Sequence, residues 1–245
     1  MAAPRFHVGL DLAPAMAGEI VDLPDAVAHH AVRVVRMSVG DSLTLFTGRG
    51  GEYAATLTRV DKRGAAVRLD AFVSVERESP LAVTLVQGIA ANDAMDYAVR
   101  KAVELGVAAI QPVVTVRSTA LPSGERGERR LAHWRQIAVA ACEQCARNRI
   151  PEVAVPQTLG DWLAAWRAEG LVLAPTGSES LASLPQPTSA LALLVGPEGG
   201  LEQIEIDSAR ARGFVAVHLG PRVLRTETAG VAALAAVQAL WGDLR

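Results

Sequence analysis

The sequence contains few aromatic residues, few cysteines and very few lysines. Phenylalanine, tyrosine and tryptophan make up 4% of the 245 residues, which argues against a nucleic-acid surface built from rows of stacking aromatics. Two cysteines argue against a disulfide scaffold and are typical of a reducing cytosol, so we expect a cytoplasmic protein. Of the 24 basic residues only Lys62 and Lys101 are lysines. Coding bias is one explanation; the other is that phosphate contacts use the planar guanidinium of arginine.

Long hydrophobic runs and an excess of positive charge are also absent. Apolar stretches such as 190–195 are far shorter than the ~18 residues that suggest a membrane span. The residues after Met1 do not have the pattern of a signal peptide, so we expect no membrane contact. The net charge of −2 excludes nucleic-acid binding through bulk charge alone. Half of the residues are hydrophobic, which predicts a folded chain with a sizeable core.

The pattern of apolar and turn residues differs between the two parts of the chain, which predicts two domains that join near 77–80. The first part has one helical stretch, 25–37, and short apolar runs separated by turn residues, as in a small β-barrel or sandwich. Its strands are expected at 42–46, 52–60 and 65–73.

The second part alternates strands and helices, which predicts an α/β domain with a mainly parallel sheet. Ligands of such sheets bind beyond the carboxyl ends of the strands. Strands are expected at 81–89, 107–116, 152–156, 171–175, 190–196 and 214–220, and helices at 93–105, about 125–147, 159–169, 201–212 and about 227–241.

A glycine-rich segment, 196–200, connects a buried strand to a helix. Its three glycines around Pro197 let backbone approach a ligand closely, although a rigid turn explains the same residues. The segment lacks the common phosphate-loop patterns. Glu198, Glu202 and Glu205 crowd the helix start, where they would repel a phosphate. We therefore expect a neutral or cationic ligand group at this loop.

A second Gly-Pro segment follows the strand expected at 214–220. It carries Arg222 and Arg225 and leads into a helix that is rich in small residues. Two such loops at neighbouring strand ends predict a single cleft.

The helix expected at about 125–147 ends in a polar cluster that contains Cys142 and Cys145. The cysteines lie inside the helix, away from its N-terminus, and the chain has no second pair of zinc ligands. We therefore expect no metal site. Glu143 and Arg147 stand four residues apart, and either a surface ion pair or a functional cluster explains them.

A basic group lies within the helical stretch 25–37. His29, Arg33 and Arg36 are spaced to share one helical face. Backbone contacts to RNA and a solvated face both account for this spacing.

Taken together, these segments resemble the RsmE-type ribosomal RNA (uridine-N3) methyltransferases of the SPOUT superfamily. The resemblance covers nearly the whole chain and is carried by 29–37, 77–80, 101–107, 141–152, 196–201 and 219–228. The chain departs from the family pattern at Ala94, Val116, Ala146 and Ala174.

The resemblance implies a fold, a cofactor and a reaction. It implies a PUA-like β-barrel RNA-binding domain over 1–75 and a SPOUT α/β trefoil-knot methyltransferase domain over 76–245. The implied reaction is S-adenosylmethionine-dependent methylation of uridine N3 in small-subunit (16S) ribosomal RNA, by a homodimer. The sulfonium of this cofactor is cationic and carries no phosphate, which agrees with an acidic loop.

The resemblance also implies roles for individual residues. The catalytic candidates are Arg147 and Arg225, as stabilisers of the uracil anion, and Glu143 or Glu198, as proton acceptor. RNA is expected at His29, Arg33, Arg36 and Arg149. The cofactor is expected at Pro175, Gly196, Glu198, Gly199, Gly200, Leu219, Gly220, Leu224, Arg225, Thr226, Thr228 and Ala229.

Two other functions remain open at this point. One is a methyltransferase of the same fold that acts on transfer RNA or on a ribose 2′-oxygen. The other is a non-enzymatic RNA-binding assembly factor. A nicotinamide dehydrogenase is disfavoured because the dinucleotide fingerprint is absent and the helix start is acidic.

Overall fold

The computed structural model describes residues 3–118 and 124–244 and divides the chain into two compact units. The first unit runs to Glu78 and also includes Cys142–Ile150. The second comprises Ser79–Ala141 and the chain from Pro151 onward. The prediction divides the chain after residue 75 and assigns 142–150 to the second domain, whereas these compact units group Cys142–Ile150 with the first.

The first unit is built on a five-stranded sheet with the order β1-β3-β4-β5-β2. β1 runs parallel to β3, and the other neighbours are antiparallel. The three predicted strands are confirmed, and two short ones are added at the edges. The strands are β1 (Arg5–His7), β2 (Ile20–Asp22), β3 (Ser42–Phe46), β4 (Glu52–Asp61) and β5 (Gly64–Val73).

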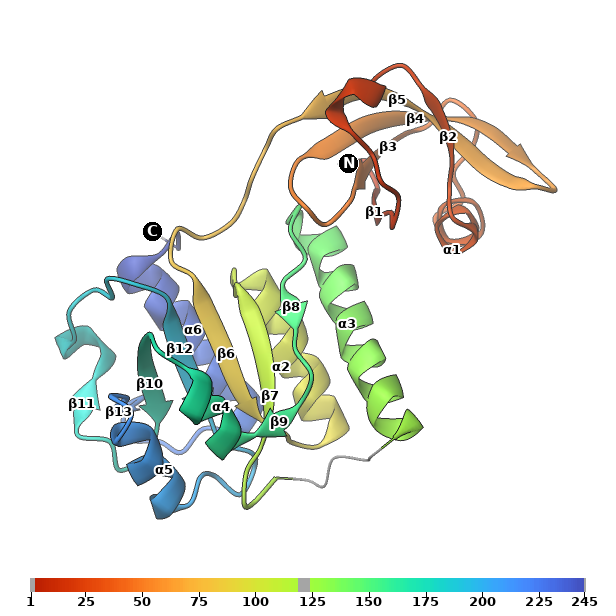
Figure 1. Cartoon of the computed structure of the whole chain (residues 1–245). Coiled ribbons are helices and arrows are strands. Elements are labelled where there is room, and N and C mark those ends of the chain that lie inside the picture. The colour runs from red at the N-terminus through yellow and green to blue at the C-terminus, as the bar shows by residue number, and fades with distance from the viewer. Residues whose placement is uncertain (1–2, 119–123, 245) are drawn as a thin grey trace. The chain divides into compact units, whose positions relative to one another are not determined.

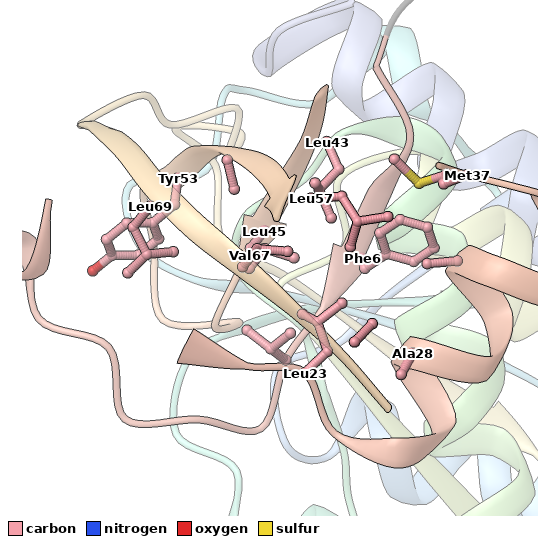
Figure 2. Close-up of a cluster of buried hydrophobic side chains, with 14 residues drawn as sticks. Phe6, Leu23, Ala28, Met37, Leu43, Leu45, Tyr53, Leu57, Val67 and Leu69 are labelled. Carbon is pink, nitrogen blue, oxygen red and sulfur yellow. The ribbon is translucent and has the colours of Figure 1, made fainter. Parts of the chain in front are cut away.

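Alternate side chains of this sheet form the core of the first unit. Leu43 and Leu45 of β3 are buried while Ser42 is exposed, as the two-residue period of a strand requires. Figure 2 shows side chains of the strands gathered with Leu23 and Met37, which flank the helical segment.

The helix predicted over 25–37 is shorter and less regular than expected. It is an α-helix, α1, over Asp25–His29, followed by a π-helical turn, η2, over His30–Val34. Arg36 then takes a left-handed φ of 64°. His29, Arg33 and Arg36 are exposed, but they do not share one regular α-helical face as their spacing predicted.

Segment Cys142–Ile150 is tied to the first unit by a buried ion pair and by backbone contacts. The Arg147 guanidinium pairs with the Glu78 carboxylate, and the arginine side chain is only 4% exposed. Asn148 Nδ2 donates to the Val75 carbonyl at 2.8 Å, and the Asn148 carbonyl accepts from the Gly50 amide at 3.1 Å. Because an unpaired charge is costly to bury, Arg147 and Glu78 fix each other's positions, and with them the segment Cys142–Ile150.

The second unit contains a parallel sheet with the order β11-β13-β10-β12-β6-β7-β8, and β9 also pairs with β7. The order is not sequential: β12 lies between β10 and β6, and β13 lies between β10 and β11. The strands are β6 (Val83–Gly88), β7 (Ala109–Val114), β8 (Glu152–Val153), β9 (Gln157–Thr158), β10 (Glu169–Leu173), β11 (Glu179–Ser180), β12 (Leu191–Val195) and β13 (Val215–His218). This confirms the predicted α/β class with a parallel sheet.

Helices cover both faces of this sheet. Figure 1 shows α2 and α6 together on one side and α4 and α5 on the other, as their mutual contacts require. Thr158 Oγ1 caps α4 by accepting from the Asp161 amide, and α4 ends earlier than expected. The helices are α2 (Asn92–Glu104), α3 (Glu125–Cys145), α4 (Leu159–Ala165), α5 (Gln203–Arg210) and α6 (Thr226–Trp241), with short 3₁₀ turns η1 (Pro14–Met16) and η3 (Leu181–Ser183).

Two kinds of feature are not found in the described ranges 3–118 and 124–244. None of their helices is long and apolar enough to cross a membrane. No group of three metal-ligating side chains is placed to hold an ion.

The ion pair beneath Cys142–Ile150 predicts a large difference between two neighbouring arginines. Arg147→Met should lower the free energy of unfolding by about 3 kcal/mol, because it leaves Glu78 without its buried partner. The matched control is Arg149→Met, since Arg149 pairs with Glu76 while its side chain is 55% exposed; the loss should stay below about 1 kcal/mol. Urea denaturation followed by circular dichroism measures both, and equal losses would contradict this role of Arg147.

The two cysteines should differ in reactivity. Burial raises the pKa of the Cys142 thiol to about 12, whereas Cys145 is partly exposed. At pH 8 roughly one Cys142 in ten thousand is then a thiolate, the form that reacts. Brief treatment of the folded protein with iodoacetamide should therefore alkylate Cys145 alone, as read by peptide mass spectrometry. Equal labelling of both residues in the native state would show that the Cys142 thiol is not buried away from solvent and reagent.

Candidate functional site

A cavity of about 340 Å³ lies at the carboxyl ends of three neighbouring strands of the second unit, β10, β12 and β13. Its walls are the segments that follow those strands: 173–175, 195–201 and 219–224. This is the location that the strand–helix alternation predicted, because parallel strands end at one edge of the sheet. The volume suits a small-molecule ligand.

Ten of the twelve residues predicted to contact the cofactor line this cavity; Arg225 and Thr228 are not among its lining residues. The ten are Pro175, Gly196, Glu198, Gly199, Gly200, Leu219, Gly220, Leu224, Thr226 and Ala229. The sequence reasoning missed several others, most of them apolar: Arg117, Leu173, Ala174, Val195, Pro197, Leu201, Ile206, Arg222 and Val223.

The loop over 196–200 folds back on itself and needs glycine. The Gly200 amide donates to the Pro197 carbonyl at 2.8 Å, and Gly200 has a left-handed φ of 70°. A Cβ on Gly196 would lie 2.8 Å from the Gly200 carbonyl carbon. The turn is therefore tight and presents backbone to the cavity.

The end of β6 packs against this loop. A Cβ on Gly88 would lie 2.7 Å from the backbone nitrogen of Pro197, which leaves no room for any side chain. The only signal in the sequence was an isolated glycine at the end of an apolar strand, which marks a close backbone approach.

A buried network joins the two Gly-Pro loops beneath the cavity. Gln87 is 1% exposed, and its Nε2 donates to Thr226 Oγ1 at 2.8 Å and to the Gly88 carbonyl at 3.0 Å. Thr226 Oγ1 in turn donates to the Gly196 carbonyl at 2.5 Å. Carbonyls only accept hydrogen bonds, so the orientation of the Gln87 amide is fixed. The loop after β12 and the start of α6 are thereby held to the end of β6.

The three glutamates that the sequence grouped at one helix start have separate partners. Glu198 lines the cavity, and its Oε1 accepts from the Ala91 amide just before α2 at 2.7 Å. Glu205 is buried and accepts from the amides of Val116 and Glu202, each at 2.9 Å. Among the described lining residues Glu198 is therefore the one carboxylate, and the expected repulsion of phosphate rests on fewer charges than the sequence predicted.

The predicted catalytic residues have settings that differ from those expected. Arg147 and Glu143 belong to the first unit and are not among the residues that line the cavity. Arg147 is buried against Glu78, and Glu143 accepts from the His7 amide at 2.9 Å. Arg225 is exposed and precedes α6 as its N-cap residue. The sequence could not show the burial of Arg147 because its partner lies 69 residues away.

The residues predicted to contact RNA lie in the first unit. Arg149 is exposed, and its Nε is 3.1 Å from a Glu76 carboxylate oxygen. His29, Arg33 and Arg36 have exposed side chains, with no ion pair recorded to any residue of the described ranges.

Two family models match the chain. One describes an RNA methyltransferase domain and matches residues 77–238; the other describes an RNA methyltransferase PUA domain and matches 23–70. Two relatives named ribosomal RNA small subunit methyltransferase E are similar over most of their length. The Synechocystis protein is 35% identical over 90% of this chain and 73% of its own, and the Buchnera aphidicola (Schizaphis graminum) protein 31% over 98% of each.

Solved structures are similar over their whole length. A ribosomal RNA small subunit methyltransferase E from Neisseria gonorrhoeae, bound to S-adenosylmethionine, has a TM-score of 0.92 and 39% identity over 100% of both chains. A putative methyltransferase from Legionella pneumophila, also with S-adenosylmethionine, has a TM-score of 0.94 and 37% identity over the same coverage. With a family model over most of the chain and relatives at this identity, the chain belongs to the ribosomal RNA small subunit methyltransferase E family.

Proposed function

We propose that this protein transfers the methyl group of S-adenosylmethionine to N3 of a uridine in small-subunit (16S) ribosomal RNA. The observation that carries the proposal is the cavity at the ends of β10, β12 and β13, lined by the two Gly-Pro loops. Family membership supports an RNA methyltransferase of the small ribosomal subunit. The choice of uridine N3 is the finer part of the proposal and rests on the resemblance of the loop motifs.

The cavity fits S-adenosylmethionine in shape and charge. Leu173, Val195 and Leu219 offer apolar wall for an adenine ring, and the glycines of 196–200 offer backbone groups. Glu198 supplies a negative charge near which a sulfonium is favoured. Two structurally similar relatives contain this cofactor, which supports the same assignment here.

The reaction is an in-line displacement in which the bound cofactor supplies an electrophilic methyl group. Uridine N3 forms the new bond to carbon as the sulfur–carbon bond breaks, and the N3 proton passes to a base. The protein's first task is orientation, because correct placement of two reactants lowers the barrier strongly. The second is to stabilise the uracil anion, for which guanidinium groups are suited.

The catalytic roles are assigned among the predicted residues. Arg225 precedes α6 directly after a cavity loop and stabilises the uracil anion, and Glu198 on the cavity wall is the proton acceptor. Arg147 and Glu143 also remain in this proposal as groups that support the reaction from the first unit. Their contacts with Glu78 and His7 favour a positioning role over contact with the base.

The strand order supports a trefoil knot. β13 comes after β10 and β11 in the chain, yet lies between them in the sheet. This order agrees with the knotted methyltransferase fold that the resemblance implies. In the same way, the five-stranded sheet of the first unit and the PUA family match support a PUA-like barrel.

The first unit is proposed to bind the RNA. His29, Arg33 and Arg36 are exposed, and Arg149 is a further exposed arginine of the same unit. Such groups contact phosphates and position an RNA without reading its sequence. The resemblance further supports a homodimer that works in the cytoplasm during ribosome biogenesis.

Product analysis tests the proposed function. Small-subunit ribosomal RNA without modifications, alone and assembled with ribosomal proteins, is incubated with the protein and methyl-labelled S-adenosylmethionine. Unmodified transfer RNA is incubated in the same way, and the nucleosides of each sample are separated by mass spectrometry. Labelled N3-methyluridine is the expected product. Label in a 2′-O-methyl nucleoside or only in transfer RNA would overturn the uridine-N3 assignment, and cofactor binding without any transfer would indicate an assembly factor.

The contact between β6 and the loop over 196–200 predicts a specific loss of cofactor affinity. Gly88→Ala should raise the Kd for S-adenosylmethionine roughly tenfold or more, because the new methyl group meets fixed backbone at Pro197 and displaces the loop. Calorimetric titration measures this.

Gly160→Ala is the matched control. Gly160 lies in α4, and a Cβ there would have its nearest neighbour at 3.9 Å. Its cofactor affinity should remain within twofold of the unmodified protein. Unchanged affinity in Gly88→Ala would show that this strand end does not set the shape of the loop.

A further inference from the structure

The rim of the cavity carries two guanidinium groups from different loops. Among the described residues that line the cavity, three are charged: Arg117, Glu198 and Arg222. Glu198 is anchored at the start of α2 through the Ala91 amide. Arg117 follows β7, whereas Arg222 follows β13, so the two cations approach the cavity from separate segments.

Arg117 is held in place before any ligand arrives. Its Nη1 donates to the Gly199 carbonyl at 2.9 Å, and its Nε lies 3.5 Å from a Glu202 carboxylate oxygen. The preceding residue, Val116, donates its amide to buried Glu205. The side chain is still 51% exposed, so part of its guanidinium faces solvent in a preorganised position.

Arg222 lies in an exposed part of the loop that follows β13. Pro221, Arg222 and Val223 are all exposed, and within the described ranges Val223 is the most exposed large hydrophobic residue, at 82%. No hydrogen bond or ion pair joins the Arg222 side chain to the residues that the structure describes, whereas Arg117 on the other side of the cavity has a carboxylate neighbour in Glu202. An apolar side chain beside an uncompensated cation suits a ligand that has both a flat apolar part and an anion, as a nucleotide has.

We propose that Arg117 and Arg222 bind backbone phosphates of the RNA next to the nucleotide that enters the cavity, with Val223 in contact with that nucleotide. The inference rests on the proposed function and adds a place on the second unit where the RNA is held. A base must leave its stack to reach the methyl donor, and its flanking phosphates then remain outside the cavity, at the rim. Planar guanidinium forks match phosphate oxygens there.

The carboxylate of the cofactor is the other anion that these arginines could bind, and the two sources give different signatures. A phosphate contact releases counterions, so affinity for RNA depends on salt and each lost contact flattens that dependence. A cofactor contact changes the affinity for S-adenosylmethionine instead. The exposure of Val223 and Arg222 at the outer rim favours the phosphate.

The test uses the full-length protein with three kinds of variant. Arg222→Gln and Arg117→Gln remove one charge each, Arg222→Lys keeps the charge, and Arg212→Gln is the matched control. Arg212 is an exposed arginine of the same unit, but it precedes β13 at the strand end away from the cavity. The Kd for unmodified small-subunit ribosomal RNA is measured over a series of salt concentrations, and the Kd for S-adenosylmethionine is measured by calorimetry.

The expected results separate the two arginines from bulk charge. Each Gln variant at the rim should weaken RNA binding roughly tenfold at low salt and reduce the slope of log affinity against log salt by about 0.7 to 0.9. Arg222→Lys should keep most of the slope. Cofactor affinity should stay within threefold in both Arg222 variants, and Arg212→Gln should behave like the unmodified protein.

Three results would overturn the inference while leaving the proposed function intact. They are an unchanged salt slope in Arg222→Gln, an equal loss in Arg212→Gln, and a main effect on cofactor affinity. Failure of the proposed function is distinguishable, because the unmodified protein would then form no N3-methyluridine.

Discussion

The buried contact of Gln87 with Thr226 is the constraint on which the cavity depends. The ends of β6 and β12 and the start of α6 meet there. The Gln87 amide nitrogen, the Thr226 hydroxyl and the Gly196 carbonyl are buried and pair with one another. The Gln87 amide donates to acceptors on the β6 end and on α6, and Thr226 passes the connection on to Gly196. Without this crosslink the distance between the two Gly-Pro loops could vary. Here the loop after β12 and the start of α6 are both fixed to the end of β6. The positions of Glu198 and Arg117 follow, because Glu198 is part of the loop over 196–200 and Arg117 donates to the Gly199 carbonyl of that loop.

The sequence predicted most elements of the fold because each element leaves a local pattern. Continuous apolar runs such as 191–195 predict strands that are buried on both faces, and the structure confirms β12 with all five residues buried. The order of strands leaves no such pattern, since any buried strand can neighbour any other. The hydrophobic periodicity of the sequence therefore could not predict that β13 lies between β10 and β11. The sequence also did not predict the π-helical turn at His30–Val34, because the apolar spacing of 25–37 fits a regular α-helix well.

The candidate site divides in the same way. Residues within the two loop motifs were identified because glycine, proline and charge occur there in an unusual local combination. Gln87, Gly88 and Arg117 lie on other segments, and only the sheet brings them to the loops. Arg147 shows what the local pattern leaves out. Its charge beside Glu143 suggested chemistry, but a charge in a sequence does not reveal whether it faces solvent or a distant carboxylate such as Glu78. Long-range pairing decides that, and a single sequence does not contain it.

The distribution of charge around the cavity explains how a chain of net charge −2 can act on RNA. Carboxylates near the loop over 196–200 are directed at backbone amides: Glu198 at Ala91, and Glu205 at Val116 and Glu202. They stabilise the site from within, and Glu198 leaves one negative charge where a sulfonium cation is to be held. The arginines lie further out, on the rim. Because attraction between exposed charges fades over about a Debye length, an RNA phosphate responds to the nearest guanidinium groups and not to the total charge of the chain. A site that binds a cationic sulfonium inside the cavity and RNA phosphates at its rim needs negative charge inside and positive charge outside. The loops that carry Glu198 and the arginines must therefore be held rigidly, so that the opposite charges stay apart.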